Sequence, residues 1–153
     1  MKFFDLHCDT IGECCKNKVS LRKNNLHISL EKAKNFESYT QVFAIWIPDE
    51  LRKEKAVAYF NTVCDYYNSE LLRNKDLVTC YNPLKQEEKR IKSILAVEGG
   101  AALGGTIDGL YHLTLRLVTA RGLLFFNLCS FVFLFVLTIT HTLFLSNTSE
   151  NNV

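Results

Sequence analysis

The chain opens with the run KFFDLHCD at residues 2–9, which predicts a strand ending in two polar side chains. Three apolar residues favour a short buried strand here, namely Phe3, Phe4 and Leu6. Side chains two apart on a strand point to the same face, so His7 and Asp9 should project together from its C-terminal end. An imidazole nitrogen beside a carboxylate oxygen suits a borderline divalent ion such as zinc. The alternative is an exposed histidine followed by an aspartate in a turn.

A second run, SILAVEGG at residues 93–100, ends in a carboxylate and two glycines. It predicts a buried strand that delivers Glu98 at its C-terminal end, where Gly99 and Gly100 let the backbone turn. The alternative is that Glu98 is only the first exposed residue after a core strand. Barrel enzymes collect their catalytic groups from the ends of different parallel strands, which favours reading the two runs together.

The residues between these runs predict alternating strands and helices. A strand is expected over 39–47, and a helix beginning at 48–50 should follow it. Apolar residues then recur three and four apart, as on one face of a helix: Ala56, Phe60, Val63, Tyr67 and Leu71. A short strand over 77–81 and a helix over 84–92 complete the alternation. This order predicts an α/β fold with a parallel sheet.

Three segments together resemble the membrane (renal-type) dipeptidases: FDLHCDT near the start, QVFAIWIP at 41–48 and ILAVEGGAAL at 94–103. The resemblance extends over about residues 2–113. It implies a zinc metallopeptidase on a (β/α)8 TIM barrel, with two zinc ions at the mouth of the barrel. By this resemblance His7 and Asp9 bind the first ion, and the catalytic Glu98 bridges both.

The length of the chain conflicts with a complete barrel. A (β/α)8 barrel needs about 250 residues, whereas this chain has 153. We therefore expect a truncated, partial barrel, with residues 1–119 as the N-terminal portion of a dipeptidase-like domain. The family takes further zinc ligands from later strands. The remaining histidines, His27, His112 and His141, lie in no segment that matches those strands, so the second zinc site is expected to be incomplete.

The character of the chain changes after Leu113. Residues 116–119 resemble the next strand of the family, and the uncharged, Leu/Phe-rich segment 123–145 follows. Three interpretations of the tail 120–153 stay open. The segment 123–145 is long enough for a transmembrane helix, which would leave the preceding part in the cytoplasm. In the second interpretation the tail is aberrant sequence from a frame shift or a non-coding region. In the third it is native core with an insertion, in which His141, by the resemblance, touches substrate.

Composition narrows the classes of protein and of partner. The net charge is +2, and no basic stripe alternates with aromatic residues, which argues against nucleic-acid binding. The first strand leaves no room for a secretory signal peptide, so a cytoplasmic protein with reduced cysteines is expected. The resemblance implies a dipeptide substrate, cleaved with the help of a hydroxide between two zinc ions. The alternative is a non-catalytic, membrane-associated remnant of that fold. A homo-oligomer is compatible with either.

Overall fold

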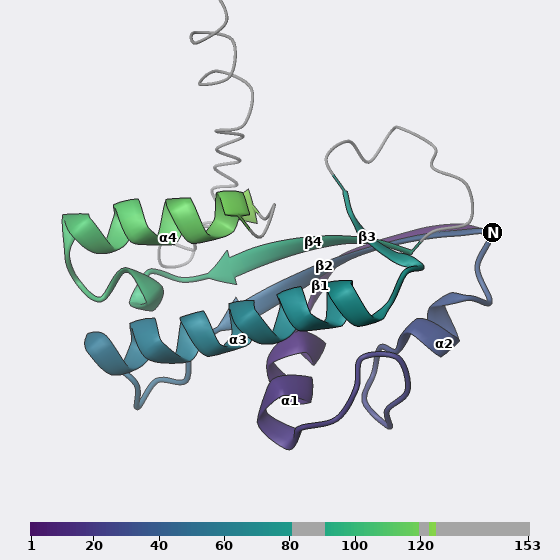
Figure 1. The fold of residues 1–153 in the computed structure, drawn as a ribbon, viewed down its shortest axis with the longest axis horizontal. Helices are drawn as coiled ribbons and strands as arrows, with labels where there is room; N and C mark the ends of the chain where they lie inside the picture. Colours follow the sequence, from purple (N-terminus) through teal and green to yellow (C-terminus); the bar gives the residue numbers. More distant parts are fainter. Residues whose placement is uncertain (81–90, 120–122, 125–153) are drawn as a thin grey trace, which may run out of the picture.

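A computed structural model describes residues 1–80, 91–119 and 123–124, in which strands and helices alternate (Figure 1). The strands are β1 (Lys2–Cys8), β2 (Ser38–Trp46), β3 (Leu77–Thr79), β4 (Ile91–Glu98) and β5 (Leu123–Leu124). The helices are α1 (Thr10–Asn17), α2 (Leu30–Ala33), α3 (Glu54–Arg73), the 3₁₀ helix η1 (Ala101–Leu103) and α4 (Ile107–Thr119).

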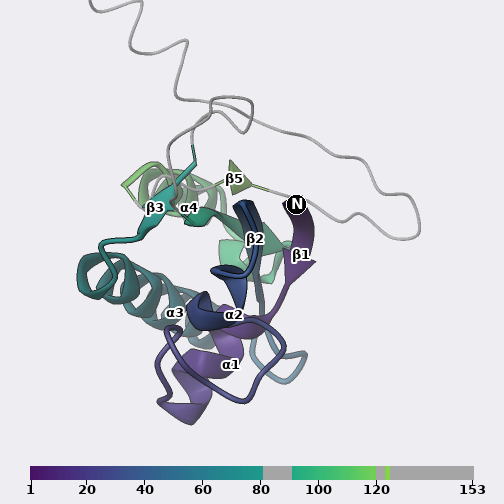
Figure 2. The ribbon, with the colours of Figure 1, turned by 90° about the vertical axis from the view of Figure 1, so that its right-hand side faces the viewer.

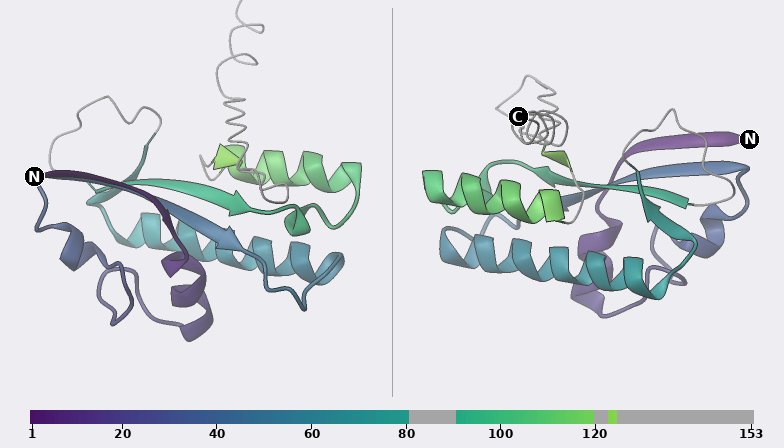
Figure 3. Two further views of the ribbon diagram at one scale, coloured as in Figure 1. Left: turned by 180° about the vertical axis from the view of Figure 1, so that it is seen from behind. Right: turned by 45° about the horizontal axis from the view of Figure 1, so that its top comes forward.

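The described strands form one parallel sheet in the order β1-β2-β4-β3, and β5 pairs with the C-terminal part of β4. The pairings of β2 with β1, and of β4 with β2, β3 and β5, are all parallel, and the long strands run the same way in Figure 3. The predicted α/β class with a parallel sheet is confirmed. Among the described residues β1 has no partner beyond β2, so this part of the chain is an open sheet.

One face of the sheet packs against helices and forms the main core (Figure 2). From β2 this face contributes Tyr39, Phe43 and Ile45, which lie buried against the apolar stripe of α3. The stripe is confirmed: its members Ala56, Phe60, Val63 and Tyr67 are buried, and Leu71 packs at the margin. The opposite face of β2 and β4 carries Val42, Ile94 and Ala96, which form a second, smaller cluster.

Strand β1 is less buried than predicted. Phe4 is 43% exposed and Leu6 is 72% exposed, whereas every residue of β2 from Tyr39 to Ile45 is buried. The reason is position: β1 lies at the edge of the sheet, so neighbours cover it from one side only. Phe3 compensates in part by stacking on Tyr39, with ring centroids 5.6 Å apart.

Helix α3 begins later than predicted, at Glu54 rather than at residues 48–50. The delay has a backbone cause, because Lys53 at the N-cap has a left-handed φ of 53°, which no helical residue adopts. Pro48 still closes the strand region, and its carbonyl accepts a bond from the Leu51 amide in a turn. The prediction of a helix over 84–92 is wrong at its end, because Ile91 and Lys92 begin β4. Residues 84–90 lie outside the described residues.

Residues 116–119, predicted as a strand, belong instead to helix α4. Leu113 and Leu117 are four apart and both buried, which is the spacing of one helical face. Arg116 then fixes α4 alongside α3, because its Nη2 lies 2.7 Å from Asp65 Oδ1 and its Nε donates to Asn61 Oδ1. Helical side-chain spacing therefore explains this segment better than its likeness to a strand.

The tail 120–153 lies outside the described residues except for Leu123 and Leu124, which form β5. His141 and the proposed span 123–145 are therefore not placed, apart from that first strand pair. Of the helices that the structure describes, none has the length and apolar character needed to cross a bilayer.

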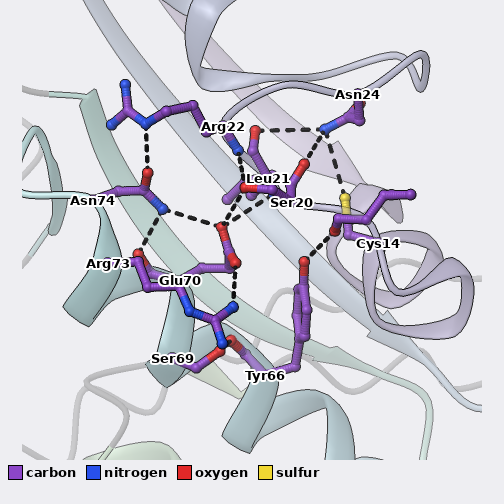
Figure 4. Close-up of polar contacts among 11 residues, drawn as sticks. Cys14, Ser20, Leu21, Arg22, Asn24, Tyr66, Ser69, Glu70, Arg73 and Asn74 are labelled. Atoms are coloured by element: carbon purple, nitrogen blue, oxygen red, sulfur yellow. Dashed lines mark hydrogen bonds and ion pairs between the residues drawn. The ribbon is translucent and has the colours of Figure 1, made fainter.

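A buried carboxylate ties α3 to the connector 18–29, which links α1 to α2 (Figure 4). The side chain of Glu70 is fully buried. Its Oε2 accepts bonds from the Leu21 amide at 3.1 Å, Ser20 Oγ at 3.3 Å and Asn74 Nδ2 at 3.0 Å. Its Oε1 accepts from Arg73 Nη1 at 3.0 Å. We call this group of residues the Glu70 cluster.

Candidate metal centre

Three ligand-type side chains meet at the C-terminal edge of the sheet. His7 Nε2 lies 2.9 Å from Glu98 Oε2 and 3.9 Å from Asp9 Oδ1. One ligand atom from each residue falls within 4.8 Å of the other two. His7 is near the end of β1, Glu98 is the last residue of β4, and Asp9 follows β1 directly. Among the described residues this is the one His/Cys/Asp/Glu group close enough to hold a metal ion.

Strand alternation explains why Cys8, between two of these residues, takes no part. Cys8 packs against the main core, on the face opposite to its neighbour His7. Burial raises the pKa of the Cys8 thiol to about 11, and a thiol must lose its proton to bind a metal. None of the five described cysteines is in a disulfide, and their reduced state stays a prediction.

The backbone at each strand end suits the ligands. Asp9 is the N-cap of α1, yet its side chain makes no capping hydrogen bond, so its carboxylate is available to another partner. After Glu98 the chain turns sharply at Gly99, which has a φ of 77° that only glycine adopts readily. At the end of the first run the Asp9 carboxylate is therefore free of a capping bond, and at the end of the second run the turn at Gly99 follows Glu98 directly.

The donor set and spacing fit zinc. Two ligands at 2.0–2.1 Å from one tetrahedral ion lie about 3.3 Å apart, and the observed separations of 2.9 and 3.9 Å bracket that value. One imidazole and two carboxylates carry two negative charges when the imidazole is neutral, which favours a divalent cation. The side chains are 54%, 58% and 36% exposed for His7, Asp9 and Glu98. Such a site leaves coordination positions open, as catalytic zinc sites do.

His7 and Glu98 come from strands that are not neighbours, because β2 lies between β1 and β4. Their side chains meet across the face of β2 that carries Val42, Ala44 and Trp46. Cys8 pairs with Phe43, so His7, one residue earlier, lies level with Val42. Glu98 pairs with Trp46. A line from His7 to Glu98 therefore crosses β2 halfway between these two levels, at Ala44. The small side chain at this position leaves room for the pair. Composition and spacing gave no signal for Ala44, which only the strand register identifies.

A larger side chain at this point should separate the ligands. We expect Ala44→Leu to weaken zinc binding by roughly tenfold or more, since Ala44 is only 2% exposed and overpacking at such sites forces side-chain and backbone shifts. Isothermal titration with zinc measures the effect. Ala58→Leu, on an exposed position of α3, is the matched control and should bind zinc as the unmodified chain does. Equal affinities in both variants would contradict this role for Ala44.

The other histidines that the structure describes are not part of the cluster, as expected for His27 and His112, which match no ligand-bearing segment of the family. His27 lies in the connector before α2, and His112 lies on the exposed side of α4 with its ring at the edge of Tyr111. His141 lies outside the described residues. A second set of zinc ligands is therefore not found among the described residues. His7, Asp9 and Glu98 are the predicted ligands that the fold brings together.

Comparisons with known proteins identify a family and a similar fold. The family described as membrane dipeptidase (peptidase family M19) matches residues 1–129. A metallo peptidase from Rhodobacter sphaeroides, solved with a phosphinate mimic of the dipeptide L-Ala-D-Ala, has a similar fold, with a TM-score of 0.62 and 16% identity. The similarity covers 74% of this chain but 42% of that protein, so this chain spans less than half of its length. No curated protein matches the sequence.

Proposed function

The chain belongs to the membrane dipeptidase family, and from this premise we propose that it carries part of a zinc-dependent dipeptidase site on the N-terminal portion of a (β/α)8 barrel. The observation that carries the proposal is the cluster of His7, Asp9 and Glu98 at the C-terminal edge of a parallel sheet. In barrel enzymes this edge is where the active site lies. The fold shared with a metallo peptidase is consistent with it.

Each ligand has a distinct task in this proposal. His7 and Asp9, two residues apart at the end of β1, would hold one ion, and Glu98 would close the site from the other side of β2. Glu98 has two carboxylate oxygens and would therefore be able to hold a second ion as well as the first. When bound, zinc polarises a peptide carbonyl and activates water for attack. The side chains of His7, Asp9 and Glu98 are open to solvent, so a small substrate such as a dipeptide would be able to reach them.

A non-catalytic role is the second candidate, and one observation favours it. The described residues supply three ligands, whereas a site with two ions needs more, and the chain spans 42% of its structural neighbour. The further ligands would come from elsewhere in the protein or from another subunit. In that case the isolated chain binds zinc without cleaving peptide bonds.

Zinc binding and hydrolysis, measured on the same purified full chain, separate the two candidates. We expect one zinc ion per chain by metal analysis after dialysis, cleavage of unmodified dipeptides, and at least about a 100-fold loss of rate in His7→Ala, because three protein ligands are needed to retain catalytic zinc. His27→Ala is the matched control and should keep both properties. Bound zinc without cleavage would establish the non-catalytic role, and a chain that retains no zinc would refute both.

A further inference from the structure

The buried strand β2 ends in a large exposed aromatic residue. From Tyr39 to Ile45 the strand is buried, but Trp46 is 48% exposed. The indole belongs to neither of the two core clusters of the described residues. Packing of the core therefore does not account for a tryptophan at this position, and an exposed indole costs free energy unless another apolar surface covers it.

The register places this residue beside the metal centre. Trp46 on β2 pairs with Glu98 on β4 in the parallel ladder. Paired residues of neighbouring strands share a face and lie about 5 Å apart, so the side chains of Trp46 and Glu98 emerge next to each other. Ala44, over which His7 and Glu98 meet, is two residues earlier on the same face. The indole of Trp46 consequently borders the group of His7, Asp9 and Glu98 at the C-terminal ends of the strands.

We propose that Trp46 is a specificity-determining residue whose indole packs against the apolar side chain of a dipeptide held at the metal centre. This inference rests on the proposed function and deepens it. When the scissile carbonyl of a bound dipeptide points toward the metal ligands, a side chain of that dipeptide lies within a few ångströms of the carbonyl and beside Trp46. Aromatic and aliphatic side chains gain most from contact with an indole, because it offers a wide, flat apolar surface. The ligand class is therefore a dipeptide with a bulky apolar side chain.

Trp46 is also the single tryptophan of the chain, which makes the test direct. Tryptophan emission of the zinc-loaded full chain reports on this one residue. We expect the emission to shift to shorter wavelength when a non-hydrolysable phosphinate dipeptide mimic with a benzyl side chain is added, because the ring excludes water from the indole. A mimic with two methyl side chains should shift it less. Adding the benzyl mimic to His7→Ala should produce no shift.

Affinity for the same two mimics, measured by isothermal titration, provides the second readout. Trp46→Ala should bind the benzyl mimic about tenfold more weakly, and the methyl mimic within about threefold of the unmodified chain. Trp46→Phe, which keeps an aromatic ring, should recover most of the difference. Leu72→Ala removes an exposed apolar side chain from the far end of α3 and serves as the matched control.

The outcomes separate this inference from the proposed function. Normal zinc binding together with equal losses for both mimics, or no loss for either, would overturn the role of Trp46 and leave the zinc site intact. Failure of the unmodified chain to bind zinc would overturn the proposed function and this inference with it. A selective loss for the benzyl mimic, with zinc affinity unchanged, would establish the indole as the surface that selects the side chain.

Discussion

Glu98→Gln is expected to weaken zinc binding by at least about 100-fold and to remove any dipeptidase activity with it. Loss of a residue that only supports a ligand costs 10- to 100-fold in metal affinity or activity, so the loss of a charged ligand should cost at least about as much. Glutamine keeps the size of the side chain and one carbonyl oxygen, but it lacks the negative charge that attracts the cation. Titration with a chromophoric zinc chelator as competitor measures the affinity.

Stability of the metal-free chain is the control for this variant. The contact between His7 and Glu98 is exposed, and such pairs contribute little to the free energy of unfolding. Glu98→Gln should therefore unfold in urea within about 0.5 kcal/mol of the unmodified chain. Glu31→Gln, on an exposed position of α2, should change neither zinc affinity nor stability. If Glu98→Gln bound zinc normally, the cluster would not be the metal centre.

Glu70→Ala is expected to destabilise the chain by about 3 kcal/mol, the second large effect. The substitution removes the acceptor for several donors at once, including the buried backbone amide of Leu21. A buried donor left without a partner costs about 1–3 kcal/mol. The midpoint of urea unfolding, followed by far-ultraviolet circular dichroism, should fall, while the slope of the transition stays the same.

Two further variants test whether hydrogen bonding causes the loss. Glu70→Gln keeps one acceptor oxygen and should cost less than Glu70→Ala. Glu54→Ala, on the same helix but exposed, should cost under about 1 kcal/mol, the usual contribution of an acidic residue in the first turn of a helix. Equal midpoints for Glu70→Ala and Glu54→Ala would show that the Glu70 cluster contributes nothing to stability.

Sequence patterns predicted β2 and β4 well because these mostly apolar strands are buried on both faces. They predicted the apolar face of α3 because its residues recur three and four apart. They failed where the environment, rather than the residue type, decides. Phe4 and Leu6 are apolar, yet they lie on an edge strand and stay largely exposed. Lys53 gives no sequence signal for the left-handed backbone that delays α3. Residues 116–119 resemble a strand of the family, but Leu113 and Leu117 are spaced as on one helical face and Arg116 contacts α3, so the segment is helical.

The candidate site shows the same division. His7, Asp9 and Glu98 could be found from the sequence because each stands beside a break after an apolar run, and the resemblance joined the two runs. Ala44 and Trp46 could not, because their importance depends on which strand lies between β1 and β4 and in what register. Alternation along a strand tells which residues share a face, but it does not tell which residue of the next strand stands opposite.

The order of the strands has a consequence for the growing polypeptide on the ribosome. His7 precedes its partner Glu98 by 91 residues. At a synthesis rate of about 5–20 residues per second, roughly 5–18 s pass before the last ligand of the cluster has been made. Until then His7 and Asp9 can offer a metal ion only two donors, and β1 has no partner strand before residue 38 appears. If the proposed site holds a metal ion, its capture is therefore a late event, and a nascent chain stalled before β4 would have only two of the three ligands.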